Sequence, residues 1–278
     1  MLQIDSHQHF WKYDPVEHDW IDDSMQLIRR DFLPADLEPV LKANGFDGCI
    51  TVQSSQSEQE NEFQLSNAEA HDFIKGVVGW VDMRAENVEE RLAYYQQFKK
   101  LKGFRHVLQG EPQRDFMLRP DFLKGIGLLK KYGFTYDILI FPDQLTYAAG
   151  LVSRFPDQSF VIDHIAKPGI KQKQLGDWEK GIKAISAFEN VFCKVSGMVT
   201  EAHWANWKAV DFDPYLDVVV NNFGTKRLMY GSDWPVCKVA ADYGDVVGLV
   251  KAYFSAFSKT EQQDFFGLNA LQFYNINT

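Results

Sequence analysis

The sequence alternates short apolar runs with longer segments that carry helix signals, and this alternation limits the fold more than any other feature. The apolar runs occupy residues 2–7, 47–53, 76–81, 103–108, 135–140, 159–164, 191–196 and 228–231. Each run is almost continuously apolar, which is typical of strands covered on both faces in a parallel sheet. Eight strands, each followed by a helix, predict a (β/α)8 TIM barrel formed by a single domain, residues 1–278.

The segments between the runs begin and end with residues that start and stop helices. Segment 120–133 begins with Pro120 and ends with Gly133. Proline suits the first helical turn, and glycine suits the left-handed position after the last turn. Pro39 is expected to restart a helix that ends at Gly45. Further helices are expected over residues 87–101, 142–155, 214–223 and 260–276.

An open doubly wound sheet is the main structural alternative. Such a sheet usually carries a glycine-rich phosphate turn after its first strand. This chain has "HQHFW" at that position, residues 7–11. The barrel is therefore the favoured fold.

Composition excludes several classes of partner. The net charge of −9 argues against nucleic-acid or anionic-membrane binding. The chain lacks an apolar run of ~18 residues, so no membrane span is expected. Residues 1–20 do not have the profile of a signal peptide. The cysteines are Cys49, Cys193 and Cys237, and their wide spacing is typical of reduced thiols in a cytoplasmic protein.

Polar and aromatic residues gather at the predicted strand ends, where the active sites of such barrels form. One histidine at a strand end is commonly structural, but four at one rim favour a functional site. The residues at these ends are His7, His9, Gln53, Trp80, Asp82, Arg105, His106, His164, Ser196, Asp233 and Trp234.

The first strand ends in a His-X-His pair. Side chains alternate along a strand, so His7 and His9 point the same way, ~6.6 Å apart. Two imidazoles on that base can reach one metal ion, and Asp233 or His164 can complete the ligand set. Gly231, two residues before Asp233, is expected to leave room beside the ion.

Several longer stretches extend the pattern over nearly the whole chain, in order. They are "DSHQHFW", "RDFLPADLEPVL", "GFDGCITVQ", "GVVGWVD", "GFRHVLQ", "VIDHIAKP", "YGSDWPV" and "NALQFYNI". This series resembles the amidohydrolase superfamily, and within it the sugar-lactonase branch of L-fuconolactonases and L-rhamnonolactonases. The resemblance implies a barrel that activates water with bound metal.

The same resemblance assigns roles. It implies that His7 and His9 bind metal, that His164 has a metal-site or substrate role, and that Asp233 is the base that activates water. Binuclear members carry a bridging lysine after strand four and a histidine after strand five, and this chain has neither. One divalent ion is therefore expected, with zinc as the preferred metal. Some lactonases of this branch work without metal, so a metal-independent enzyme is an alternative.

Lactone hydrolysis needs an activated water, a stabilised oxyanion and a proton for the leaving alkoxide. A metal ion supplies the first two, and Asp233 can move the proton. Arg105 is expected to hold a substrate oxygen, or to pair with Asp82 or Glu111. The predicted catalytic residues are Asp233, His164 and Arg105. The predicted substrate-binding residues are Gln53, Trp80, Asp82, His106, Lys167 and Trp234.

Other functions compete with hydrolysis of a fucono-lactone or related 6-deoxy lactone. They are a metal-dependent decarboxylase on the same barrel, a metal-independent lactonase for a carboxylated lactone, and a sugar-binding barrel without catalysis. A decarboxylase would need rim arginines for a carboxylate, and the chain offers Arg105, Arg114 and Arg119. A small-molecule sugar lactone is thus the expected partner, and a homo-oligomer is compatible with the sequence.

Overall fold

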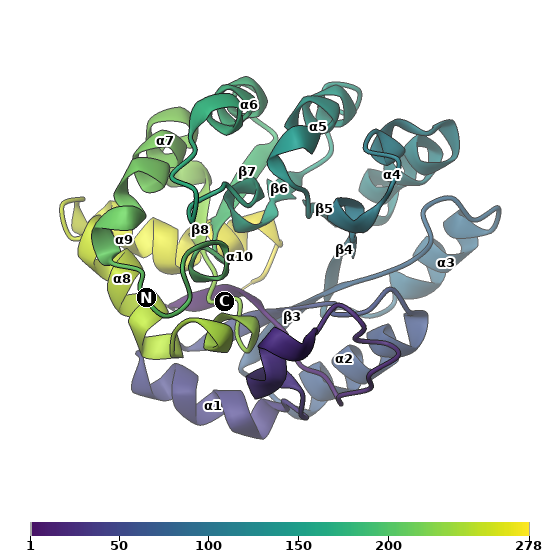
Figure 1. Ribbon diagram of the computed structural model, residues 1–278. Helices are drawn as coiled ribbons and strands as arrows, with labels where there is room; N and C mark the ends of the chain where they lie inside the picture. The colour runs from purple at the N-terminus through teal and green to yellow at the C-terminus, as the bar shows by residue number, and fades with distance from the viewer. Residues whose placement is uncertain (1, 278) are drawn as a thin grey trace.

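The computed structural model describes residues 2–277 and contains one eight-stranded parallel sheet, in sequence order, that curves into a barrel (Figure 1). Between β8 and β1, the Asp233 amide donates to the His7 carbonyl and the His9 amide donates to the Trp234 carbonyl. The predicted barrel is therefore confirmed. The strands are β1 (Ile4–Gln8), β2 (Gly48–Val52), β3 (Ile74–Gly79), β4 (Leu101–His106), β5 (Thr135–Ile138), β6 (Phe160–Ile162), β7 (Val191–Val195) and β8 (Leu228–Tyr230).

Helices surround the sheet, and each strand is followed by one (Figure 1). Their inner faces and the outer faces of the strands form one large apolar cluster. They are α1 (Pro34–Ala43), α2 (Glu58–Ala70), α3 (Val88–Tyr95), α4 (Pro120–Tyr132), α5 (Leu145–Val152), α6 (Gly176–Ser186), α7 (Asp213–Phe223), α8 (Tyr243–Phe254), α9 (Lys259–Gln263) and α10 (Asn269–Phe273).

The C-terminal helices close the bottom of the barrel. A π-helical turn, η10 (Asp264–Leu268), joins α9 to α10 and packs on β1 and β8. Gly267 allows this approach, because a Cβ there would lie 2.0 Å from the Leu2 carbonyl oxygen. A second apolar cluster lies between the barrel strands and α10. It includes Ile4, Val161, Met229, Ala270 and Phe273.

One helix expectation needs correction, and three helices were not predicted. Pro39 does not start a helix, because α1 begins at Pro34 and continues through Pro39. That position tolerates proline at the cost of one intrahelical hydrogen bond. The sequence pattern did not predict α2, α6 and α8. Among residues 2–277, no helix is long and apolar enough to cross a membrane.

Candidate metal centre and active site

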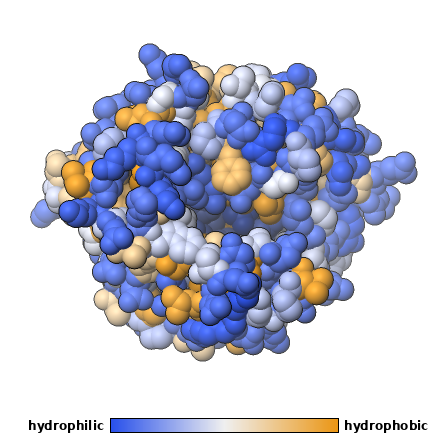
Figure 2. Space-filling model, in the orientation of Figure 1, coloured by the Kyte–Doolittle hydropathy of each residue, from blue (hydrophilic) through white to orange (hydrophobic). Residues whose placement is uncertain are grey.

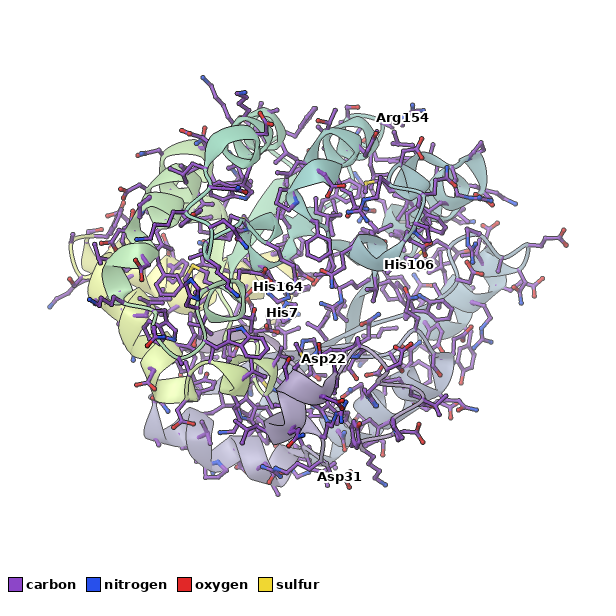
Figure 3. The ribbon with its side chains drawn as sticks, viewed as in Figure 1. His7, Asp22, Asp31, His106, Arg154 and His164 are labelled. Atoms are coloured by element: carbon purple, nitrogen blue, oxygen red, sulfur yellow. The ribbon has the colours of Figure 1, made fainter. Side chains whose placement is uncertain are left out.

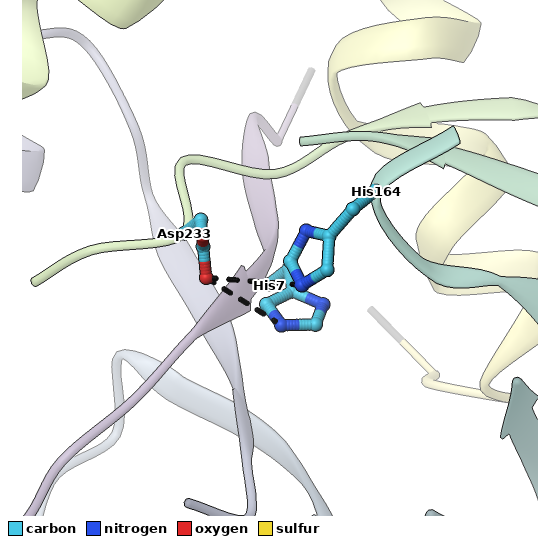
Figure 4. Close-up of side chains that lie close together, drawn as sticks. All are labelled: His7, His164 and Asp233. Atoms are coloured by element: carbon cyan, nitrogen blue, oxygen red, sulfur yellow. Dashed lines mark ion pairs between the residues drawn. The ribbon is translucent and has the colours of Figure 1, made fainter. Parts of the chain in front are cut away.

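Three side chains from distant parts of the chain converge at the mouth of the barrel. His7 lies on β1, His164 follows β6 and Asp233 follows β8. The Nε2 atoms of both histidines lie 3.9 Å from Asp233 Oδ1 (Figure 4). One ligand atom from each residue lies within 4.8 Å of the others, and all three residues are buried. The predicted convergence of these strand ends is thus present in the structure.

His9 lies beside this group. Its Nδ1 lies 2.8 Å from the Val52 carbonyl oxygen, and its Nε2 lies 3.3 Å from Asp233 Oδ1. A carbonyl can only accept, so Nδ1 carries the proton and donates it. In the neutral ring, Nε2 is then an acceptor that faces the carboxylate oxygen, which is also an acceptor. A cation between these two atoms would satisfy both.

Two glycines make room for the histidine rings. A Cβ on Gly231 would lie 2.6 Å from His7 Cβ and 3.0 Å from Ser196 Cβ. Gly231 therefore leaves room for the His7 side chain. The sequence had predicted that this glycine leaves room for a metal ion. A Cβ on Gly197 would lie 2.5 Å from His164 Nδ1. That nitrogen lies 2.9 Å from the Ser196 hydroxyl oxygen, which orients the ring and leaves Nε2 facing Asp233.

The backbone that presents His164 is strained. Residues 164–167 have four consecutive positive φ angles, between 47° and 58°, without a glycine. Left-handed backbone costs an L-residue roughly 1–2 kcal/mol, and such strain is concentrated at functional sites. The Trp178 indole on α6 donates to the Ile165 carbonyl at 2.7 Å and ties the turn to the helical layer. Asp233 also has a positive φ, 58°.

Below the three converging residues, the barrel interior holds a connected set of buried charges. Lys194 Nζ on β7 lies 2.5 Å from Asp137 Oδ2 on β5 and 3.1 Å from Asp163 Oδ1 after β6. Arg105 on β4 donates to Asp163 Oδ2 at 3.0 Å. His7 Nδ1 lies 3.3 Å from both Asp163 Oδ1 and Lys194 Nζ, and its Nε2 lies 3.9 Å from Asp233 Oδ1.

Burial sets the protonation of the histidines. It lowers the pKa of His7 and of His164 well below the ordinary value, because a buried imidazolium loses its hydration. Both rings are neutral at neutral pH, which is the form that binds metal. Burial opposes ionisation of Asp233, but polar and charged neighbours that include Lys167 hold the pKa of this carboxyl below its ordinary value. Asp233 is therefore an anion that can bind a cation or accept a proton.

Arg105 lies beside His7, but its partners differ from the predicted Asp82 and Glu111. Arg105 pairs with Asp163 and donates to the side chain of Gln53 at 2.9 Å, so neither Asp82 nor Glu111 is its partner. Its Nη1 also lies 3.3 Å from His7 Nε2. Gln53 thus holds the arginine in place, and its buried side chain lies at the edge of the site.

His106 points to the other face of β4, as alternation predicts. Its Nε2 lies 2.7 Å from Glu111, and its Nδ1 accepts from the Trp80 indole at 3.2 Å. The ring stacks on Phe116, away from His7 and His164 (Figure 3). His106 and Trp80 thus form a separate cluster beside the mouth, and their role as substrate-binding residues stays a prediction.

The other three predicted substrate residues have different surroundings. Asp82 forms an ion pair with Arg84. Lys167 ends the strained turn and lies 3.2 Å from Glu201. Trp234 is buried against Phe10 and Phe32 in edge-to-face contacts, which are those of a packing residue.

The sequence patterns missed the buried charges that support the site. Asp137, Asp163 and Lys194 each stand alone in an apolar run, in "YDILI", "VIDHI" and "FCKVS". A single charged residue in a run that is buried on both faces needs a partner of opposite charge. These three interruptions of apolar runs therefore indicate buried ion pairs. Tyr274 on the closing C-terminal segment also donates to Asp137, at 2.8 Å.

Comparisons with known proteins agree with the barrel fold. A family model described as amidohydrolase matches residues 4–276. The chain is 37% identical over 286 residues to L-fucono-1,5-lactonase of Burkholderia multivorans, which covers 99% of this chain and 96% of that protein. It is 33% identical to L-fucono-1,5-lactonase of Burkholderia ambifaria, over 88% and 84% of the two chains. A crystal structure of a Burkholderia multivorans amidohydrolase with bound zinc is 37% identical over 100% of both chains, with a TM-score of 0.96.

Proposed function

The chain belongs to the amidohydrolase family, and from this premise we propose that it hydrolyses a neutral sugar lactone to the aldonic acid. L-Fucono-lactone or a related 6-deoxy lactone is the proposed substrate. Two L-fucono-1,5-lactonases above 30% identity, one aligned over nearly the full chain, support this substrate class. A lactone is a cyclic ester, so the reaction adds water to the carbonyl and breaks the ring C–O bond.

The observation that carries the proposal is the convergence of potential ligand atoms at the barrel mouth. His7, His164 and Asp233, with His9 beside them, direct nitrogen and oxygen atoms that can bind metal into one space. Two ligands about 2.1 Å from one zinc ion lie about 3.4 Å apart at the tetrahedral angle. The 3.9 Å separations of both Nε2 atoms from Asp233 approach that value. The donor set therefore fits one divalent ion, proposed to be zinc.

The charge balance of the interior supports one ion, and not two. Arg105 and Lys194 carry positive charge, and Asp137, Asp163 and Asp233 carry negative charge. With neutral histidines the set has a net charge of about −1 at pH 7. A single divalent ion reverses this to about +1, which favours an oxyanion at the carbonyl. A second divalent ion would leave an uncompensated buried charge.

The chain's own residues supply the remaining chemistry. A divalent ion, when bound, polarises the carbonyl and lowers the pKa of water. Asp233 accepts a proton from the attacking water and returns it to the ring oxygen as the C–O bond breaks. Arg105, beside His7 Nε2, can donate to a substrate oxygen. The buried network below fixes His7 and Arg105, so neither must reorganise during the reaction.

The rim arginines favour a neutral substrate over a carboxylated one. Each of the three arginines that could bind a carboxylate already has a carboxylate partner. Arg105 pairs with Asp163, Arg114 with Asp143 and Arg119 with Asp121. Decarboxylation and hydrolysis of a carboxylated lactone would both need such a cation free.

The proposal is tested with a panel of aldonolactones and a pH indicator, because lactone opening releases acid. Purified protein is assayed as prepared, after chelation, and after zinc is restored. We expect turnover of neutral 6-deoxy lactones, a loss on chelation and recovery with zinc. Full activity after chelation would refute the role of the metal, and the absence of turnover on every neutral lactone would refute the substrate class.

A further inference from the structure

Paired charges border the mouth of the barrel, and one pair lies next to the proposed ligand His164. Lys167 follows His164 by three residues, and its amide donates to the His164 carbonyl at 2.8 Å. Its ammonium lies 3.2 Å from Glu201 Oε1, on the loop after β7. The Lys171 amide donates to the Glu201 carbonyl at 2.9 Å and joins the two loops. The pair is therefore held in place by backbone contacts.

Both charged groups of this pair are partly open to solvent. The side chain of Lys167 is 18% exposed and that of Glu201 is 23% exposed. Glu201 also forms part of the wall of a pocket of about 480 Å³. The loops after β1, β6 and β7 form that pocket, and its other lining residues are Ser24, Lys171, Gln172, Thr200, Ala202 and Trp204. Glu201 is thus accessible from this pocket, whose lining does not include Lys167 or His164.

An exposed aromatic ring also lies near the lysine. Phe141, which follows β5, is 37% exposed, and Lys167 Nζ lies 5.7 Å from its ring centroid. Figure 2 shows a hollow at the centre of this face, bordered by both polar and apolar side chains. An ammonium, a carboxylate and an aromatic face together match the hydroxyl groups and the apolar C–H face of a sugar.

We propose that Glu201, paired with Lys167, selects neutral polyol lactones over lactones that carry a carboxylate. This inference rests on the proposed function. Lys167 donates to a substrate hydroxyl oxygen and Glu201 accepts from a neighbouring hydroxyl. Glu201 also neutralises Lys167 and repels an anionic substituent, so it disfavours the competing substrate as well as binding the correct one.

The test compares two lactones with the same ring, one with a methyl group at C6 and one with a carboxylate there. Glu201→Gln keeps the side chain's size, removes the repulsion and leaves the charge of Lys167 unmatched. We expect the ratio of kcat/KM for the neutral over the carboxylated lactone to fall at least tenfold, mostly through KM. A tenfold change corresponds to ~1.4 kcal/mol. Lys167→Gln should weaken the neutral lactone without improving the carboxylated one.

The control is Glu69→Gln, an exposed glutamate in the last turn of α2. It should leave the ratio of the two kcat/KM values unchanged. An equal loss on both lactones in Glu201→Gln, or a ratio equal to that of the control, would overturn this inference while the lactonase proposal stands. If the native enzyme opens no neutral lactone, the proposed function fails and this inference fails with it.

Discussion

Gly197→Ala should damage the metal centre through His164 alone. The new Cβ would lie 2.5 Å from His164 Nδ1 and 2.8 Å from Cγ. Ordinary contact begins near 3.4 Å, so the ring must move by about 0.9 Å. Productive geometry tolerates only about 0.5 Å. Loss of the orientation that Ser196 gives the ring should therefore lower zinc affinity about 10- to 100-fold, the usual effect of a change behind a ligand.

The matched control is Gly133→Ala at the end of α4. Gly133 has a φ of 78° and Gly197 a φ of 62°, so both alanines carry a similar backbone penalty of roughly 1–2 kcal/mol. A Cβ on Gly133 would meet no atom within 4 Å. Zinc affinity is measured by competition with a chromophoric chelator, and stability by urea denaturation. Equal zinc affinity in the two variants would refute the proposed steric link between Gly197 and the metal centre.

Two further predictions concern buried titratable side chains. Lys194→Met removes the cation of Asp137 and leaves Asp163 with Arg105 alone, so the unfolding free energy measured in urea should fall by roughly 3–5 kcal/mol, and Asp137→Asn in the same chain should recover part of it. An unchanged value would mean that these carboxylates are protonated. Burial lowers the pKa of His106, so on acidification the unfolded chain gains this proton first and stability falls below pH ~6.5. His106→Gln should reduce that fall, by up to ~1.4 kcal/mol per pH unit, and parallel curves of stability against pH for the two proteins would contradict this.

The proposed ligands could be predicted from sequence because a parallel barrel brings all strand ends to one rim. His7, His164 and Asp233 follow from that rule alone, although 226 positions separate the first from the last. The same rule does not predict the buried charges that support these ligands. Asp137 and Lys194 lie inside strands, where a single charge appears as an interruption of an apolar run.

Local backbone geometry was the least predictable part of the site. The left-handed turn that carries His164 contains Ile165, Ala166 and Lys167, residues that seldom adopt positive φ. Tertiary contacts, including the bond from Trp178, stabilise a conformation that local propensity disfavours. The pairing of Lys167 with Glu201 depends on how two loops meet, which strand and helix periodicity does not specify.

The most direct test of the proposed mechanism is the turnover number of Asp233→Asn on a neutral 6-deoxy sugar lactone, with zinc content measured on the same sample. Asparagine keeps the size of the side chain and removes its basicity. We predict a loss of at least ~10²-fold in kcat, because general acid–base catalysis contributes that much. A zinc-loaded Asp233→Asn protein that opens the lactone at near the native rate, after correction for spontaneous hydrolysis, would contradict the role of Asp233 as the proton carrier.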